Sequence, residues 1–323
     1  MNAPSPATVR QLYCVLGAGS LPYARLAFRS LLAQASEPLN LRLVTDAEAD
    51  RVAIEAAMQA TPNPAGHRWS VHAQAEIDDL AANGFAGLPH LQAFRFGHPC
   101  WRKITDPLLL AEPGQEMVIL DPDLYFPNRF SFEPTPDKGI LLMWQPPSCL
   151  LPDEVVRAAY AAGVHLAHHV DIGVAHARRN IDLAWLDWLI GRLGGKDLPR
   201  MMHVEAIVWA ALVMREGGGH LPPEHWHCWR NAQWKRVALK LGVAGHRLLS
   251  ADPFDQIKCF HGGGPAKWWV PTLVDQGRMP APRDVTAHLP TVPLEELTPA
   301  LYDGTQRLKR LARRLGYYRL IGR

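Results

Sequence analysis

Two aspartates directly follow an apolar run and form the first candidate for chemistry in this sequence. The run at 116–120 (EMVIL) ends at Asp121, and Asp123 comes after one proline. A buried strand there would place both carboxylates at the carboxyl edge of a parallel sheet, where open α/β sheets bind ligands. Carboxylate oxygens suit a hard divalent cation such as Mn²⁺ or Mg²⁺, which is often shared with substrate phosphates. A pair of solvated acids, or of acids that cap a helix, is the alternative interpretation.

The second candidate is the segment 258–269 (KCFHGGGPAKWW). His261 ends an apolar run, and three glycines follow it, the last of which is Gly264. Glycine lets the backbone approach an anion closely, and Lys267 adds a point charge suited to phosphate. The alternative is a glycine-rich turn with a core histidine and an exposed lysine.

The two segments together resemble the motifs of GT-A glycosyltransferases, and most closely those of the family 8 type, which is retaining and uses nucleotide sugars. That family carries D-x-D after a strand and H-x-x-G-x-x-K-P-W near its C-terminal end. His261, Gly264, Lys267 and Trp269 match the second motif, whereas Trp268 replaces its proline. The distance of about 140 residues between the two motifs also agrees with the family.

The resemblance implies a metal-dependent enzyme that moves a sugar from a nucleoside-diphosphate donor to a glycan or lipid-linked acceptor, with retention. It implies Mn²⁺ (or Mg²⁺) as the cofactor, held by Asp121, Asp123 and His261. Gly264 and Lys267 would contact the diphosphate of the nucleotide sugar. Asp121 would contribute to binding of the nucleotide sugar as well as of the metal. A UDP-sugar is the expected donor, and a GDP-sugar is the alternative.

Three weaker matches to the family add candidate residues. Lys103 lies on an expected helix before the D-x-D, where the family has a basic residue that faces the nucleotide. Asp171 begins Asp-Ile-Gly-Val, which resembles the family's N-S-G-V strand, and Glu205 falls on the glutamine of its D-Q-D-A helix. The resemblance implies that Glu205 and Asp171 are catalytic, because either would stabilise an oxocarbenium-like sugar or accept hydrogen bonds from its hydroxyls.

The loop after the first expected strand departs from the family. Gly17, Ala18 and Gly19 stand where the family carries acidic and Asn residues that read uracil. We expect the backbone of this loop to contact the base or ribose, and the preference for uridine stays open. Asp46, after the second expected strand, would either reach a ribose or cap the helix that follows.

Apolar periodicity predicts the elements that must position these residues. The chain opens as β–α–β–α–β, which favours a mostly parallel sheet with flanking helices, and the resemblance identifies this α/β fold as GT-A (Rossmann-like). The expected strands are 11–16, 39–45, 68–73, 116–120, 139–144, 172–176, 245–249 and 256–260. The expected helices are 21–34, 47–59, 101–111, 153–162, 181–193 and 203–215.

We expect two parts in the chain. Residues 1–270 would form the nucleotide-sugar-binding and catalytic domain, and residues 271–323 a Pro-rich crossing segment with a basic amphipathic helix. In that helix, expected at 295–321, arginines alternate with leucines, a pattern suited to an anionic membrane surface. The alternative is a C-terminal helix packed on the body with its basic face in solvent.

Composition excludes several classes of protein. The 323 residues are 48% hydrophobic and 20% charged, which fits one large α/β domain and excludes global disorder. The five cysteines are scattered without a CxxC pair, which argues against a disulfide framework and fits a reducing compartment. Residues 301–323 carry a net charge of +6 and the remainder −3, so we expect no nucleic-acid partner.

The expected location is the cytoplasm, with peripheral attachment to the inner face of the membrane as the further expectation for the basic helix. The N-terminus shows no signal-peptide pattern, and no run approaches the ~18 apolar residues of a membrane span. Tryptophans stack well on sugar faces, so Trp144, Trp226 and Trp229 are candidate acceptor contacts.

Two other classes of protein fit parts of the sequence. A nucleotidyltransferase shares a similar sheet and acidic metal site, but its basic signature loop is missing at 17–20. A non-catalytic nucleotide- or sugar-binding protein with a degenerate pocket would explain the departures at Ala18, Ile172 and Ala206. The presence of Asp121, Asp123, His261 and Lys267 in register weighs against this second alternative.

Overall fold

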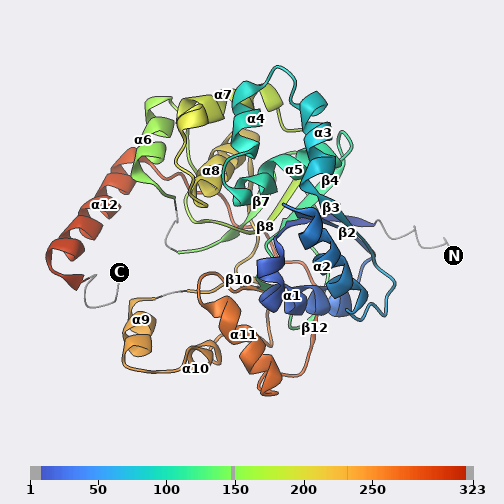
Figure 1. Ribbon diagram of the computed structural model, residues 1–323. Helices are drawn as coiled ribbons and strands as arrows, with labels where there is room; N and C mark the ends of the chain where they lie inside the picture. The colour runs from blue at the N-terminus through green and yellow to red at the C-terminus, as the bar shows by residue number, and fades with distance from the viewer. Residues whose placement is uncertain (1–8, 147–149, 231, 318–323) are drawn as a thin grey trace.

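The computed structural model describes residues 9–146, 150–230 and 232–317 and is built around a seven-stranded sheet (Figure 1). The strand order is β3-β2-β1-β4-β8-β7-β9. The strands are β1 (Arg10–Val15), β2 (Leu39–Thr45), β3 (Arg68–Ala73), β4 (Glu116–Leu120), β7 (Ile140–Trp144), β8 (Val170–Arg178) and β9 (Gly218–His220). Strand β8 runs antiparallel to both of its neighbours, and the other neighbouring pairs are parallel. The expected α/β fold with a mostly parallel sheet is confirmed.

Helices cover both faces of this sheet (Figure 1). One face is covered by α1 (Leu21–Gln34) and α2 (Glu48–Gln59). The other is covered by α3 (Gln74–Gly84), α4 (Pro89–Arg95), α5 (Arg102–Leu110), α6 (Asp153–Ala161), α7 (Leu183–Leu193) and α8 (Val204–Glu216). Alternate residues of each strand enter opposite cores, as the period of two requires: Tyr13 packs with α5, and Leu12 with the α1 side.

A smaller three-stranded sheet lies beside the carboxyl edge of the large one. Its order is β10 (Trp226–Cys228), β11 (Cys259–His261) and β5 (Leu124–Tyr125). Because β5 starts just after the two aspartates and pairs antiparallel with β11, Leu124 stands opposite His261. The backbone N–H of Gly262 also donates to the carbonyl of Asp123 at 2.9 Å. This pairing brings the two sequence motifs together.

The C-terminal part adds α9 (Gln233–Lys240), α10 (Gly245–Leu249), α11 (Ala266–Asp275) and α12 (Pro299–Arg314). A third apolar core joins α10 and α11 to Phe260 of β11. A short pair of strands, β6 (Arg129–Phe130) and β12 (Asp284–Val285), ties the segment after α11 back to the body. Three short 3₁₀ turns complete the described elements: Ala18–Ser20, Pro99–Trp101 and Gly195–Asp197.

Some element predictions were wrong. Residues 245–249 form helix α10, in which Gly245, Leu248 and Leu249 are buried. That spacing of three to four residues fits a helix, and a segment of five residues is too short for its period to distinguish the two structures. The strand expected at 256–260 is shorter and ends at His261. Within the described ranges, no helix is long and apolar enough to cross a membrane.

Candidate active site

Asp121, Asp123 and His261 converge at the carboxyl edge of the sheet. Asp121 directly follows β4, and its backbone N–H donates to the carbonyl of Gly173 on β8 at 2.8 Å. The Nε2 atom of His261 lies 3.6 Å from Oδ2 of Asp121 and 3.3 Å from Oδ1 of Asp123. One ligand atom from each of the three residues lies within 4.8 Å of the others. Two carboxylates and an imidazole at this separation fit a divalent cation such as Mn²⁺.

Asp171 holds His261 from the opposite side of the imidazole ring. Its Oδ1 atom lies 2.7 Å from Nδ1 of His261 and also accepts the backbone N–H of Gly173 at 2.9 Å. Its Oδ2 accepts a hydrogen bond from the thiol of Cys228, with Sγ at 3.2 Å. A Cβ atom at Gly173 would lie 2.6 Å from Nδ1 of His261, so this position requires glycine. A carboxylate behind a metal-binding histidine fixes the ring and its tautomer.

Lys103 links Asp121 to Glu205 on the other flank of the site. Its Nζ atom donates to Oδ1 of Asp121 at 2.6 Å and lies 3.1 Å from Oε2 of Glu205. Both Lys103 and Glu205 are buried, and the indole N–H of Trp209 donates to Glu205 at 3.3 Å. Burial, opposed by Lys103, raises the pKa of Glu205 to about 8. Glu205 is thus a buried partner of Lys103.

The charges of the site determine the protonation of His261. Burial alone would lower the pKa of His261, but Asp171 and Asp123 outweigh it and hold this pKa well above its usual value. Burial likewise works against ionisation of Asp123, yet His261 and Lys267 lower its pKa to about 2. The imidazolium thus offsets part of the negative charge of the acids. A metal ion must displace that proton, because a histidine ligand is neutral.

Lys267 and the glycine loop lie on the open side of the cluster. Lys267 is in the first turn of α11, and its Nζ atom lies 3.7 Å from Oδ2 of Asp123 and 4.9 Å from the ring centroid of Tyr23. Gly264 has a φ of 65°, which brings the chain from β11 into α11. A helix N-terminus with a neighbouring lysine attracts phosphate groups. The second motif therefore presents positive charge next to the two aspartates.

The loop after β1 lies at the point where the strand order reverses, with β2 on one side of β1 and β4 on the other. Gly17 comes before the 3₁₀ turn, and the backbone N–H of Ala18 donates to Oδ2 of Asp50 at 3.1 Å. A Cβ at Gly17 would lie 3.2 Å from the same oxygen, whereas Gly19 faces open space. Asp50 of α2 thus holds the backbone of this loop, and no local pattern in the sequence marks it.

Asp46 does not cap α2. That helix begins at Glu48, its N-cap is Ala47, and no side chain caps it. Asp46 instead forms an ion pair with Arg102, at the first position of α5. The helix-capping interpretation of Asp46 was therefore wrong.

The tryptophans expected to contact the acceptor differ in exposure. Trp226 is fully buried, and its indole N–H donates to Glu133 at 2.6 Å, so it cannot stack on a sugar. Trp229 is also buried and packs edge-on against Trp269. Trp144 is half-buried at the end of β7. Two of the three acceptor contacts were thus wrongly assigned, because alternation along β10 turns Trp226 into the core.

The chain is similar in structure to solved glycosyltransferases, one of them with a TM-score above 0.5. Mouse xyloside xylosyltransferase 1, in its apo form, superposes with a TM-score of 0.51 at 14% identity, over 80% of this chain and 99% of that chain. The galactosyltransferase LgtC with donor and acceptor sugar analogues gives 0.43 at 12% identity, over 80% and 89% of the two chains. Core-mannan synthase A from Aspergillus fumigatus, in its Mn/GDP form, gives 0.40 at 11%, over 70% and 74%.

No protein-family model and no curated protein matches the sequence. The similarity to mouse xyloside xylosyltransferase 1 therefore establishes the fold, which is that of the GT-A glycosyltransferases.

We predict that Asp171 controls metal affinity without being a ligand. Asp171→Asn should weaken Mn²⁺ binding about 10- to 100-fold, because the imidazole of His261 loses its orienting carboxylate. Asp123→Asn, which replaces a ligand, should weaken it further. Titration calorimetry of the purified chain measures both.

Asp182→Asn is the matched control, because Asp182 caps α7 away from the cluster and Asn caps a helix equally well. Wild-type Mn²⁺ affinity in Asp171→Asn, together with a loss in Asp123→Asn, would contradict the orienting role.

Proposed function

We propose that this chain is a metal-dependent glycosyltransferase that moves a sugar from a nucleoside-diphosphate donor to a glycan or lipid-linked acceptor. The observation that carries the proposal is the convergence of Asp121, Asp123 and His261 beside Lys267 on a GT-A fold. Packing alone does not explain this cluster, because removing ionisable groups from water is costly unless they are paired or bind a metal. His261 is buried, and the side chains of Asp121 and Asp123 are only 14% and 11% exposed. Retention of configuration is proposed from the match to the two motifs.

Asp121, Asp123 and His261 would hold Mn²⁺ (or Mg²⁺). When bound, the ion would supply positive charge that stabilises the diphosphate as it leaves. Lys267 and the amides around Gly264 would contact the same diphosphate. These groups act mainly in the transition state, because the negative charge of the leaving group grows as the sugar bond breaks.

The loop at Gly17, Ala18 and Gly19 would bind the nucleoside. Gly19 leaves open space in which a ribose or base can approach the backbone. Lys103, ion-paired with Asp121, would keep that carboxylate in place for the metal and the nucleotide sugar. A UDP-sugar is the proposed donor and a GDP-sugar the alternative.

Glu205 and Asp171 would act through other side chains. Asp171 has both of its oxygens engaged and touches His261, so we assign it the positioning of that ligand. Glu205 is buried against Lys103, so we assign it the positioning of the lysine. For both residues, the contacts support these roles better than direct contact with the reacting sugar.

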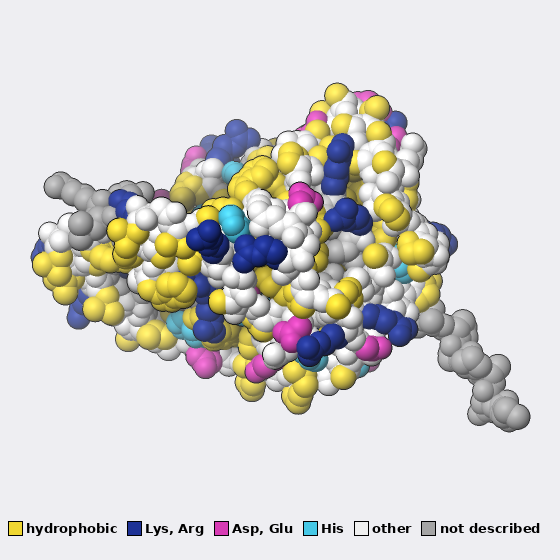
Figure 2. Space-filling model, turned by 90° about the horizontal axis from the view of Figure 1, so that it is seen from below, with side chains coloured by type: hydrophobic (Ala, Val, Ile, Leu, Met, Phe, Trp, Pro, Cys, Tyr) yellow, Lys and Arg dark blue, Asp and Glu magenta, His cyan; other side chains and the backbone are white. Residues whose placement is uncertain are grey.

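We further propose that α12 attaches the protein peripherally to an anionic membrane, on its cytoplasmic face. Leucines on one face of this helix are exposed, and basic residues lie between them: Leu301, Leu308, Leu311 and Leu315; Arg307, Lys309, Arg310, Arg313 and Arg314. The hydroxyl of Tyr317, just beyond α12, donates a hydrogen bond to the side chain of Gln233 on α9. Trp234 and Val237 of α9 are also exposed hydrophobic residues. Figure 2 shows hydrophobic and basic side chains side by side on the left of the molecule, where α9 and α12 lie in Figure 1. Residues 318–323, including Arg319 and Arg323 of the basic segment, lie outside the described residues.

We predict that one nucleoside diphosphate binds only when Mn²⁺ is present. Calorimetry with UDP, GDP, CMP and ADP, with and without Mn²⁺, should give metal-dependent binding of UDP. Lys267→Met should weaken UDP binding about 10- to 100-fold, the cost of a lost charge-assisted hydrogen bond. It should not weaken Mn²⁺ binding, because it removes a positive charge beside Asp123.

Lys138→Met is the matched control, because Lys138 is exposed before β7, at the opposite edge of the sheet. Failure of all four nucleotides to bind would favour a degenerate pocket. Equal affinity of the Lys267→Met variant and the wild type for UDP would contradict the proposed contact between Lys267 and the diphosphate.

We predict that replacing Leu308, Leu311 and Leu315 by serine reduces binding to phosphatidylglycerol-containing vesicles at least about tenfold, because each leucine loses apolar burial in the lipid. Sedimentation with vesicles measures the bound fraction. Leu80→Ser on α3 is the control, since Leu80 is an exposed leucine on another helix. Unchanged sedimentation of the triple variant would contradict membrane attachment through α12.

A further inference from the structure

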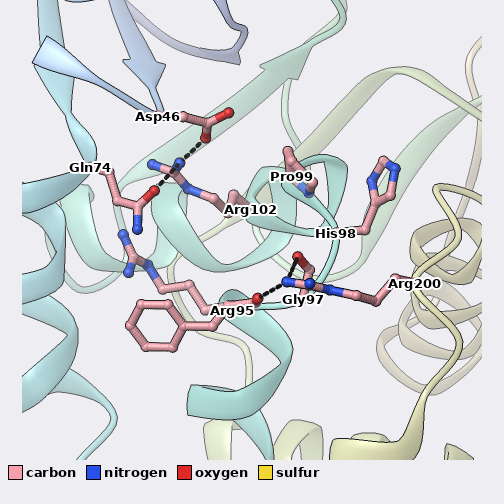
Figure 3. A pocket seen from close by; sticks show the side chains of 9 residues that line it. Asp46, Gln74, Arg95, Gly97, His98, Pro99, Arg102 and Arg200 are labelled. Atoms are coloured by element: carbon pink, nitrogen blue, oxygen red, sulfur yellow. Dashed lines mark hydrogen bonds and ion pairs between the residues drawn. The ribbon is translucent and has the colours of Figure 1, made fainter.

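A cavity of about 540 Å³ is lined by residues of several helices and by residues that follow two strands of the large sheet (Figure 3). Asp46 after β2 and Gln74 after β3 line it, so it lies on the same carboxyl edge of the sheet as the aspartates. Arg102 of its wall directly precedes Lys103. The volume falls within the range of about 300–1,000 Å³ that is typical of small-molecule sites. None of the roles proposed above uses this cavity.

Helix α5 connects the cavity to the metal cluster. Its first residue, Arg102, lines the cavity, and the next residue, Lys103, donates to Oδ1 of Asp121 at 2.6 Å. A ligand in the cavity would therefore lie against the helix that contacts the cluster.

Arg95 is the strongest sign of a ligand. This arginine is only 2% exposed and lines the cavity. Its Nε atom donates to Asp106 at 2.8 Å and its Nη1 atom to Asp78, but the buried Nη2 atom has no hydrogen-bond partner. A buried guanidinium nitrogen without a partner costs free energy, and a bound acceptor atom would recover it.

Two more arginines line the cavity. Figure 3 shows Arg102 reaching it from the side of Arg95, and Arg200 from the opposite side. Arg102 is engaged with Asp46, Asp106 and Gln74. Arg200 is exposed, and its Nη2 atom donates to the carbonyls of Phe96 and Gly97 at 2.8 and 3.1 Å. None of the ion pairs within the described ranges includes Arg200, so its charge is available to a ligand.

The remaining wall adds features that suit a carbohydrate. Asp46 is the one carboxylate in the wall, and it would accept hydrogen bonds from sugar hydroxyls. The Phe96 ring is 55% exposed and lies 5.5 Å from the guanidinium carbon of Arg95. An exposed aromatic ring provides a surface on which the apolar face of a sugar packs.

We propose that this cavity binds an acidic sugar of the acceptor, with its carboxylate or phosphate held between Arg95 and Arg200. Guanidinium groups bind both kinds of oxyanion through paired hydrogen bonds, so the shared chemistry is that of an oxyanion on a sugar. The inference deepens the proposed glycosyl transfer by naming the class of acceptor, and it rests on that proposal.

The test uses the full chain and four probes: glucuronate, glucose 6-phosphate, glucose and inorganic phosphate. Ligand-observed NMR titration should show binding of the two acidic sugars in the absence of nucleotide, and about tenfold weaker binding or none for glucose. Arg200→Gln should weaken glucuronate binding at least about tenfold, because a charge-assisted hydrogen bond is lost. Arg95→Lys should do the same, and circular dichroism checks its folding.

Arg179→Gln is the matched control, because Arg179 also donates to a backbone carbonyl, that of Leu108, but lies just past β8 at the other edge of the sheet. Equal affinity for glucuronate and glucose, or wild-type glucuronate affinity in Arg200→Gln, would overturn the proposal. If UDP fails to bind with Mn²⁺ while glucuronate still binds at the arginines, then glycosyl transfer fails and the acidic-sugar site stands.

A second arm separates acceptor from donor. With UDP and Mn²⁺ bound, glucuronate should still bind, and UDP-glucuronate should bind no tighter than UDP-glucose. Tighter binding of UDP-glucuronate, with the difference removed by Arg200→Gln, would place the acidic sugar on the donor and overturn the assignment to the acceptor.

Discussion

The imidazole of His261 is held between Asp171 on one nitrogen and the Asp121–Asp123 pair on the other. Three carboxylates this close together would repel one another strongly without a cation between them. An imidazolium offsets one of these charges, and Lys103 and Lys267 lie beside Asp121 and Asp123. A bound divalent ion with a neutral imidazole would offset two of the three. The fold must therefore position the three carboxylates and the imidazole accurately, because otherwise removing these charges from water would destabilise the folded state.

The architecture meets this requirement through pairings between distant segments. Strand β8 runs antiparallel beside β4, so Gly173 accepts the amide of Asp121 and leaves room for the histidine ring. Strand β11 pairs with β5 and with β10, which sets His261 opposite Leu124 and Cys228. Positive groups then surround the acids, with Lys103 on the core side and Lys267 on the solvent side. The cavity lined by Arg95, Arg102 and Arg200 places further positive groups at the same edge of the sheet.

Local patterns in the sequence were enough to single out the three residues that the structure brings together at the sheet edge. Asp121 and Asp123 end an apolar run, and His261 with its glycines is a compact motif, so the sheet and these three residues were predicted together. Contacts set by tertiary pairing were not predictable: Cys228 behind Asp171, Asp50 at the first loop and Arg95 in the cavity come from separate segments with no local signature. Residues 245–249 and Trp226 were misassigned because segments this short reveal neither their period nor which face is buried.

A crystal of the protein grown with Mn²⁺ and UDP, measured at the manganese absorption edge, tests the central claim most directly. The account predicts one anomalous peak within about 2.0–2.6 Å of carboxylate oxygens of Asp121 and Asp123 and of Nε2 of His261. Nδ1 of His261 should keep its hydrogen bond to Asp171. A peak on the other side of the ring, bound by Asp171, Cys228 and Nδ1, would contradict it, as would the absence of any peak between the two aspartates.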